Sequence, residues 1–220
     1  DTVDWRVKGA VAEVKNQGKL CLANYAFTVT GLIEAMNFIE TGKLLPFSEQ
    51  QLIDCASPNY SFGCQDGFVS SAFSYAQGYG LQLASDYPWN SAGEADCLYD
   101  SSKAIPVNYN LKDIENFSPS ALKAALVDSP VVVMIETGED AFQNYVGGVI
   151  KTKCGSNVNH AALVVGYDSK RWGEEGFIVK NSWGPCWGDG GYVYISTKGY
   201  LNQGAGACGI LVSPMAPSKN

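Results

Sequence analysis

One segment near the start of the chain restricts the possible folds more than any other. From Asn24 to about Thr41, apolar residues surround much of a helical circumference; they are Phe27, Val29, Leu32, Ile33, Met36 and Phe38. A helix that is apolar on most sides is buried inside a domain rather than laid on its surface. Gly42 follows as a C-cap, because glycine readily adopts the left-handed conformation that ends many helices. The sequence therefore predicts a long buried helix with other elements packed around it.

The remaining patterns divide the chain into a helical part and a strand-rich part. Ser48, with Gln51 three positions on, starts a capping box and a second helix, and Phe68 to Tyr75 is typical of a third. After Pro88, short β-branched or aromatic runs separated by Gly, Asn and Asp indicate strands, with a helix expected over Ser118 to Val127. The expected strands are 106–116, 131–136, 149–152, 161–167, 176–180 and 191–196. The chain has no internal repeats and no low-complexity linker. The change from helical to strand patterns near residue 110 is therefore expected to lie inside one compact unit.

Composition excludes several functional classes. The chain has 220 residues, of which 46% are hydrophobic, and a net charge of −7. A nucleic-acid partner is not expected, since binding phosphates requires a basic face. No apolar run approaches the roughly 18 residues of a membrane helix, and the N-terminus lacks the pattern of a signal peptide. No Cys-x-x-Cys pair suggests a zinc or redox centre. We expect a mature, soluble protein with no metal, no cofactor and no transmembrane segment.

The residues around the start of the buried helix form the most specific motif. Asn16 to Gly18 reads Asn-Gln-Gly, Cys21 follows, and Asn24 to Phe27 reads Asn-Tyr-Ala-Phe. His160, the only histidine, lies at the entry to an apolar strand, and Asn181 to Gly184 reads Asn-Ser-Trp-Gly. This combination resembles the papain-like cysteine peptidases over essentially the whole chain. The resemblance implies an α+β, papain-like fold: a helical left domain and an antiparallel β-barrel-like right domain, with a cleft between them.

The resemblance also implies how the chain is divided. Residues 1–220 would form a single papain-like unit, with about 11–110 in the helical half. About 1–10 and 111–210 would form the β-rich half, because the family's termini each cross to the opposite domain. Val3 to Val11 resembles the family's mature N-terminus, before which a propeptide is removed. A zymogen-derived form is therefore expected.

The main departure from the family falls at the nucleophile position. Counted back from the Ala-Phe pair, that position is held by Asn24, and Cys21 falls where the family keeps a disulfide cysteine. A thiol at a helix N-terminus beside an imidazole ionises readily and attacks carbonyl groups. A carboxamide has no ionisable proton, and its nitrogen lone pair is delocalised. Asn24 should therefore cap a helix well and attack carbonyls badly.

Further departures lie next to this position. Tyr25 and Leu22 stand where the family has Trp and Gly, and one extra residue lies between Gly18 and Cys21. An engineered knockout would change one residue and leave its neighbours alone, so clustered departures favour a naturally inactive protein. Leu22 is expected to crowd the approach of a peptide backbone, since the family has no side chain there.

By resemblance, Gln17, His160 and Asn181 complete a remnant catalytic site around Asn24. Gln17 would donate to an oxyanion together with the backbone N–H of residue 24. Asn181 would orient the imidazole of His160, and a tryptophan would shield their hydrogen bond from water. An extended peptide would contact Gly67, Phe68, Val69, Val158, Ala161, Trp183 and Trp187. Asp66 replaces the first of the family's paired glycines.

The seven cysteines are assigned by the same resemblance. It implies the disulfides Cys21–Cys64, Cys55–Cys97 and Cys154–Cys208 and leaves Cys186 unpaired. Each bridge should stabilise the fold by roughly 3–5 kcal/mol, and together they imply an oxidising compartment: secreted, lysosomal or vacuolar. The sequon at Asn59 is compatible with secretion. Cys186 is expected to be a buried, inert thiol; the alternative is a displaced nucleophile or redox handle.

These observations favour a catalytically inactive homologue, a pseudopeptidase with a binding or structural role. Its partners would be extended peptides or a protein in the cleft. One alternative is an active cysteine endopeptidase in which Asn24 was introduced by mutation or another thiol is the nucleophile. The other is a storage or matrix protein, which would occur as part of a fixed assembly. Assays of peptide turnover and of labelling by thiol-reactive peptide inhibitors distinguish the pseudopeptidase from the active endopeptidase.

Overall fold

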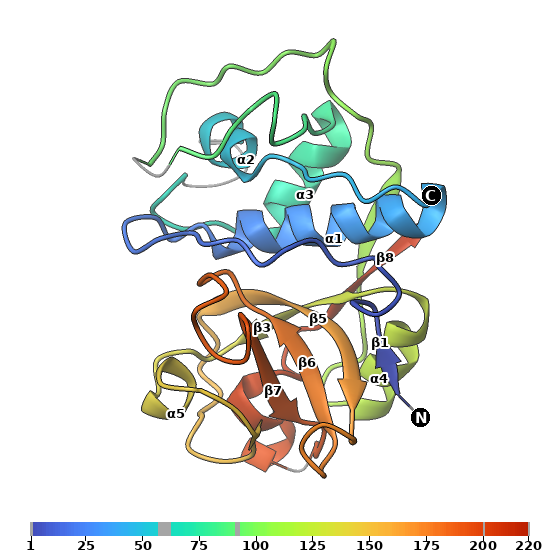
Figure 1. The fold of residues 1–220 in the computed structure, drawn as a ribbon, viewed down its shortest axis with the longest axis vertical. Helices are drawn as coiled ribbons and strands as arrows, with labels where there is room; N and C mark the ends of the chain where they lie inside the picture. Colours follow the sequence, from blue (N-terminus) through green and yellow to red (C-terminus); the bar gives the residue numbers. More distant parts are fainter. Residues whose placement is uncertain (1, 57–62, 91–92, 200, 220) are drawn as a thin grey trace.

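Helix α1 (Asn24–Thr41) runs through the middle of the molecule, with α2 (Glu49–Cys55) and α3 (Val69–Tyr79) on one side and the sheet on the other (Figure 1). The computed structural model describes residues 2–56, 63–90, 93–199 and 201–219, so the sequon at Asn59 lies outside the described residues. The first thirteen side chains of α1 are buried with the exception of Phe27. Gly42 ends the helix in the left-handed conformation, with φ at 73°. The apolar pattern therefore predicted this helix correctly.

Two shorter helices, α2 (Glu49–Cys55) and α3 (Val69–Tyr79), pack against α1. Ser48 caps α2, because its hydroxyl accepts the N–H of Gln51 at 3.0 Å. The expected capping box is only half formed: the side chain of Gln51 donates to the carbonyl of Gly80 and accepts the N–H of Gln82. Gln51 therefore ties α2 to the segment after α3.

The described residues contain eight strands in one sheet, in the order β2-β8-β3-β5-β6-β7-β4, with β1 paired to β5. Their bounds are β1 Val3–Asp4, β2 Tyr109–Asp113, β3 Val131–Ile135, β4 Val149–Ile150, β5 His160–Asp168, β6 Gly176–Lys180, β7 Tyr192–Ser196 and β8 Met215–Lys219. Helix α4 (Pro119–Asp128), the short α5 (Asp140–Gln143) and the 3₁₀ turns Leu201–Gly204 and Ala207–Gly209 complete this half.

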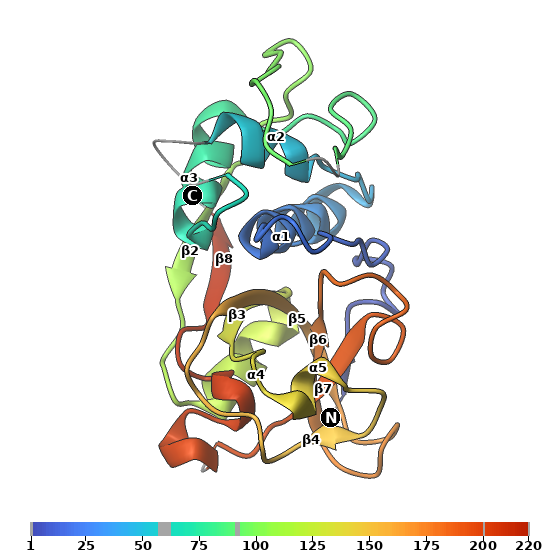
Figure 2. The same ribbon diagram turned by 90° about the vertical axis from the view of Figure 1, so that its left-hand side faces the viewer.

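The sheet differs from the expected antiparallel barrel in two respects. Its two end strands, β2 and β4, are not paired with each other in the described structure, so the sheet is open. The pair β4–β7 is parallel, because the chain returns through β5 and β6 before β7 begins. Figure 2 shows the reason for the opening: β2 and β8 extend toward α3, away from β4.

The central strand β5 is buried on both faces and joins the two cores. Ala161, Leu163 and Val165 belong to the cluster that contains α1 and the helical half. Ala162 and Val164 belong to the second cluster, which contains side chains of α4 and β3 on the other face of the sheet. This alternation is the period of two that a strand imposes. Strand β5 therefore connects the core of the helical half to the core of the sheet half.

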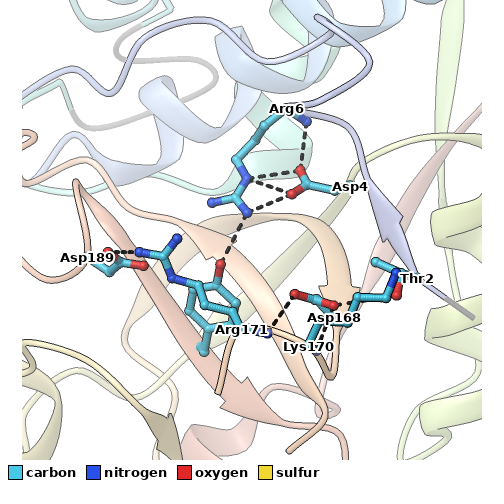
Figure 3. A network of polar contacts seen from close by, with 8 residues as sticks. Thr2, Asp4, Arg6, Asp168, Lys170, Arg171 and Asp189 are labelled. Carbon is cyan, nitrogen blue, oxygen red and sulfur yellow. Dashed lines mark hydrogen bonds and ion pairs between the residues drawn. The ribbon is translucent and has the colours of Figure 1, made fainter. Parts of the chain in front are cut away.

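The N-terminal segment lies on the sheet side. Val3 and Asp4 pair with Tyr167 and Gly166 of β5. A Cβ at Gly166 would lie 2.0 Å from the carbonyl oxygen of Val3, so only glycine allows this approach. Figure 3 shows how the guanidinium of Arg6 holds the segment, by an ion pair of 2.7 Å with Asp4 and a bond of 3.2 Å to the hydroxyl of Tyr194.

The three expected disulfides are confirmed: Cys21–Cys64, Cys55–Cys97 and Cys154–Cys208. Cys186 is free, but it is exposed, and the expectation that it would be buried was wrong. The neighbouring Trp187 fills the interior side of this loop instead, since its ring stacks on that of Phe142 at 5.1 Å between centroids.

Candidate functional site

His160 and Asn181 meet because His160 begins β5 and Asn181 directly follows β6, its antiparallel partner. Nε2 of His160 is 2.9 Å from Oδ1 of Asn181. The same oxygen accepts the backbone N–H of Ser182 at 2.8 Å, which identifies it as the oxygen of the carboxamide. Because an oxygen can only accept here, Nε2 carries the proton in this bond. Nδ1 is then the bare nitrogen of a neutral imidazole.

Burial keeps this imidazole uncharged. His160 is 4% exposed, and burial lowers its pKa to about 4, although the hydrogen bond that His160 donates to Asn181 acts in the opposite direction. The ring of Trp183 lies edge-on to the imidazole at 5.4 Å and packs in turn against Trp187 and Phe142. This aromatic cluster covers the bond between His160 and Asn181 on one side.

Asn24 is the first residue of α1 and connects the helix to the sheet. Its side-chain oxygen Oδ1 accepts the backbone N–H of Ala161 at 2.9 Å, and the residue is 7% exposed. The expectation of an N-terminal cap at Asn24 was inaccurate in detail: the N-cap is Ala23, and no side chain caps the helix. The carboxamide of Asn24 therefore bonds across the two halves rather than along its own helix.

Gln17 is anchored at both ends of its carboxamide. Nε2 donates to the carbonyl of Cys21 at 3.0 Å, and Oε1 accepts the hydroxyl of Ser182 at 2.6 Å. The backbone N–H of Gln17 also donates to the carbonyl of Ser182. Since Ser182 donates to Asn181 as well, a continuous series of bonds runs from Gln17 to His160. One Nε2 proton of Gln17 is engaged in this way, which leaves one for an external acceptor.

A buried ionic cluster behind the site was missed by the sequence analysis. The ammonium of Lys15 lies 3.1 Å from Glu34 and 2.5 Å from Glu49. Burial raises the pKa of Glu34, against the opposing effect of Lys15, and burial lowers the pKa of Lys180 nearby. A carboxylate in the middle of the apolar pattern of α1 was the available signal, because buried charges occur in pairs.

A small cavity separates this cluster from Asn181. Its volume of about 20 Å³ has room for about one water molecule. Its lining includes the four charged residues of the cluster together with Asn181 and Ser182. Nδ2 of Asn181 is sealed from solvent and has no hydrogen-bond partner. The nitrogen of this carboxamide is thus a polar atom that the described protein surroundings leave unsatisfied.

Comparison with known proteins identifies the family. A family model described as papain family cysteine protease matches residues 1–218. The chain belongs to this family. It is 36% identical over 222 residues to the cysteine proteinase RD21A of Arabidopsis thaliana, covering 100% of the chain and 47% of the relative. It is 40% identical over 220 residues to the cysteine endopeptidase Rep1 of Oryza sativa subsp. japonica, covering 99% and 58%. The chain therefore spans about half the length of the curated relatives it matches.

Solved structures of papain-family proteins confirm the expected fold. The Carica candamarcensis cysteine protease CMS1MS2, in complex with E-64, superposes with a TM-score of 0.88 at 35% identity, covering 100% of the chain and 98% of that protein. The proform of the Amb a 11 cysteine protease, a ragweed pollen allergen, gives a TM-score of 0.91 at 34% identity, covering 100% and 65%. The papain-like fold is thereby established for this chain.

The residues expected to contact a peptide differ in how exposed they are. The backbone of Gly67 packs on the ring of Tyr25, since a Cβ there would lie 2.7 Å from the ring. Its N–H donates to the carboxylate of Asp66 at 2.7 Å, a bond that a peptide carbonyl would have to displace. Val69 and Ala161 are buried, Val158 is half-buried, and Phe68 is 67% exposed. Phe68 thus faces solvent rather than lining an enclosed apolar pocket.

The described residues show no feature of a metal centre or a membrane segment. Among them no group of three or more His, Cys, Asp and Glu side chains is placed to hold a metal ion. No helix in the described ranges is both long enough and apolar enough to cross a membrane.

Proposed function

We propose that the chain is a non-catalytic member of the papain family that binds polypeptide near Asn24 and His160 without cleaving it. One observation carries the proposal: the side chain at the start of α1, beside His160, is a carboxamide whose oxygen accepts the N–H of Ala161. By resemblance this is the nucleophile's position. A carboxamide cannot be activated by a neutral imidazole in the way that a thiol can.

The state of the cysteines supports the same proposal. Six of the seven form disulfides, and a disulfide sulfur is not a nucleophile. The free thiol of Cys186 belongs to the loop that follows Trp183. Catalysis by this thiol would need it aligned with both His160 and the oxyanion donors on one carbonyl group. The three disulfides also fit folding in an oxidising compartment, and we propose a secreted, vacuolar or lysosomal location.

A second candidate function is an active cysteine endopeptidase. Two observations favour it: the relatives are named as proteases, and the bond between His160 and Asn181 is present. In this case Cys186 would supply the thiol, or Asn24 would be an introduced residue. The two candidates make opposite predictions for turnover.

A sensitive assay with fluorogenic peptides tests the proposal. The wild-type chain and Asn24→Ala should both show no turnover, because neither has a thiol at the helix start. Asn24→Cys should gain weak activity, since His160, Asn181 and Gln17 surround the new thiol. Loss of a nucleophile can cost on the order of 10⁶ in rate, so even a weak gain is measurable. Wild-type turnover at the rate of an ordinary cysteine peptidase, abolished by His160→Ala, would reject the proposal.

A further inference from the structure

The sequence contains two Asp-Gly pairs, Asp66-Gly67 and Asp189-Gly190, and their surroundings in the structure differ. In such a pair the backbone nitrogen of the glycine can attack the side-chain carboxyl carbon of the aspartate, which closes a five-membered succinimide ring. Glycine favours this reaction because it has no side chain to hinder the approach of its nitrogen. Two identical pairs in one chain allow the effect of the fold to be separated from the effect of the dipeptide.

At the first pair, the two reacting groups are already in contact. The N–H of Gly67 donates to Oδ1 of Asp66 at 2.7 Å. Because Oδ1 is bonded to the carboxyl carbon Cγ, this hydrogen bond holds the attacking nitrogen close to the atom that it attacks. Groups held in contact react faster than groups that must first meet. Asp66 is exposed, and among the described residues no cation pairs with its carboxylate.

At the second pair, the carboxylate is held by an arginine. Nη2 of Arg171 lies 2.6 Å from Oδ1 of Asp189, as Figure 3 shows. The backbone of Asp189 is also fixed, because its N–H and its carbonyl both pair with Tyr192. Among the described hydrogen bonds none joins the N–H of Gly190 to this carboxylate. Ring closure at this pair therefore requires the carboxylate to leave Arg171 first.

We propose that Asp66 isomerises spontaneously in the folded chain, through a succinimide formed with the nitrogen of Gly67, whereas Asp189 is protected. In ring closure the bond between this nitrogen and Cγ of Asp66 forms, and one C–O bond of the neutral carboxyl group breaks. The hydroxyl group leaves with the amide proton as one water molecule. Water then opens the ring at either of its two carbonyl groups, which restores aspartate or gives isoaspartate. Water is the only co-reactant, and nothing is oxidised or reduced.

Isoaspartate changes the backbone as well as the side chain. The main chain then runs through Cβ and Cγ of residue 66, so one methylene group is added before Gly67. The ring of Tyr25 leaves no room beside Gly67, since a Cβ there would lie 2.7 Å from the ring. The added length therefore displaces Gly67 from this ring or shifts the segment that leads into α3. This inference does not rest on the proposed function.

Incubation of the full chain at pH 6, in buffer and in urea, tests the proposal. A carboxyl group is neutral in a larger fraction at pH 6 than at pH 7, which favours the loss of water. Peptide mapping with endoproteinase Asp-N, which cleaves before aspartate but not before isoaspartate, measures both pairs in one sample. In urea the two pairs should convert at similar rates. In the folded chain Asp189 should convert roughly 10-fold or more slowly than Asp66, because its bond to a charged donor must break first.

Three variants separate the geometry from the dipeptide. Asp66→Glu keeps the charge but would have to close a six-membered ring, so conversion at residue 66 should disappear. Arg171→Ala releases the carboxylate of Asp189, so conversion at residue 189 should rise several-fold while conversion at Asp66 stays the same. Asp113→Glu is the matched control, because Asp113 is exposed and is followed by isoleucine; conversion at Asp66 should not change. Thermal melts report the folding of each variant.

The comparison of the folded with the unfolded chain decides the matter. Faster conversion at Asp66 than at Asp189 in buffer, with similar rates in urea, supports the proposal. Equal conversion of the two pairs in the folded chain overturns it, as does an unmodified Asp66 after the time in which the unfolded chain has reacted. A difference that is as large in urea as in buffer also overturns it, because the neighbouring sequence would then be its cause. Peptide turnover, which tests the proposed function, enters none of these outcomes.

Discussion

Acidification from pH 7 to pH 4 should destabilise the folded chain through a single imidazole. Burial lowers the pKa of His160 from 6.5 to about 4, and the hydrogen bond that His160 donates to Asn181 only partly offsets this. As the pH falls, the unfolded chain takes up a proton near pH 6.5, whereas the folded chain does so only near pH 4. Between these values the unfolded state binds more protons, so stability decreases with decreasing pH. The contribution of His160 is complete above pH 6.5 and is lost toward pH 4.

The size of this effect follows from the two pKa values. They differ by about 2.5, and each pKa unit corresponds to about 1.4 kcal/mol, so the full loss is about 3 kcal/mol. The free energy of unfolding of an ordinary domain is about 5–15 kcal/mol. One residue would therefore remove a substantial fraction of the free energy of unfolding.

Urea unfolding of the wild type and of His160→Gln at pH 7, 5.5 and 4.5 isolates this contribution. Carboxylates titrate in the same range, but they are common to both proteins and cancel in the difference. The bond to Asn181 changes in the variant, yet that change does not vary with pH. NMR titration of the only histidine gives its pKa directly. A pKa near 6.5, or a difference between the two proteins that is constant with pH, would refute the reasoning.

Three further predictions concern the loops and the cysteines. Asp66→Gly should strengthen binding of an extended peptide several-fold in calorimetry, because the neighbouring N–H no longer donates to a carboxylate; an unchanged affinity contradicts this. Replacing Cys154 and Cys208 by alanine should lower the free energy of unfolding in urea by about 4 kcal/mol, since the bridge closes a loop with a sequence separation of 54. A loss below about 1 kcal/mol argues against the chain-entropy account. Cys186 is exposed, so iodoacetamide should alkylate it in the native chain about as fast as in urea; protection in the native chain would show that its loop is covered.

The elements with strong periodicity were predictable from the sequence, and those defined by pairing were not. The bounds of α1 follow from its apolar positions and from Gly42. Strand β8 (Met215–Lys219) lacks alternation and contains Pro217, so only its partners β2 and β3 make it a strand. The parallel pairing of β4 depends in the same way on where the chain returns after β6.

In the site, the resemblance led to His160 and Asn181 being expected in contact, and they lie 2.9 Å apart. It gave no indication that Asn24 would accept the N–H of Ala161, a residue 137 positions away. Which atom of a carboxamide faces which neighbour depends on the final packing of α1 against β5. The anchoring of Gln17 on Cys21 is likewise a local consequence of the loop that contains the extra residue.

The bond between Asn24 and Ala161 also constrains how this lineage could change. Any exchange that places a thiol at residue 24 removes the acceptor of a buried N–H, and an unsatisfied buried donor costs about 1–3 kcal/mol. If the chain is non-catalytic, as proposed, the exchange that restores a thiol would thus lower stability in the same step that gains weak activity. Mutations that stabilise the contact between α1 and β5 would offset this loss, so the order in which substitutions occur affects how readily residue 24 can change.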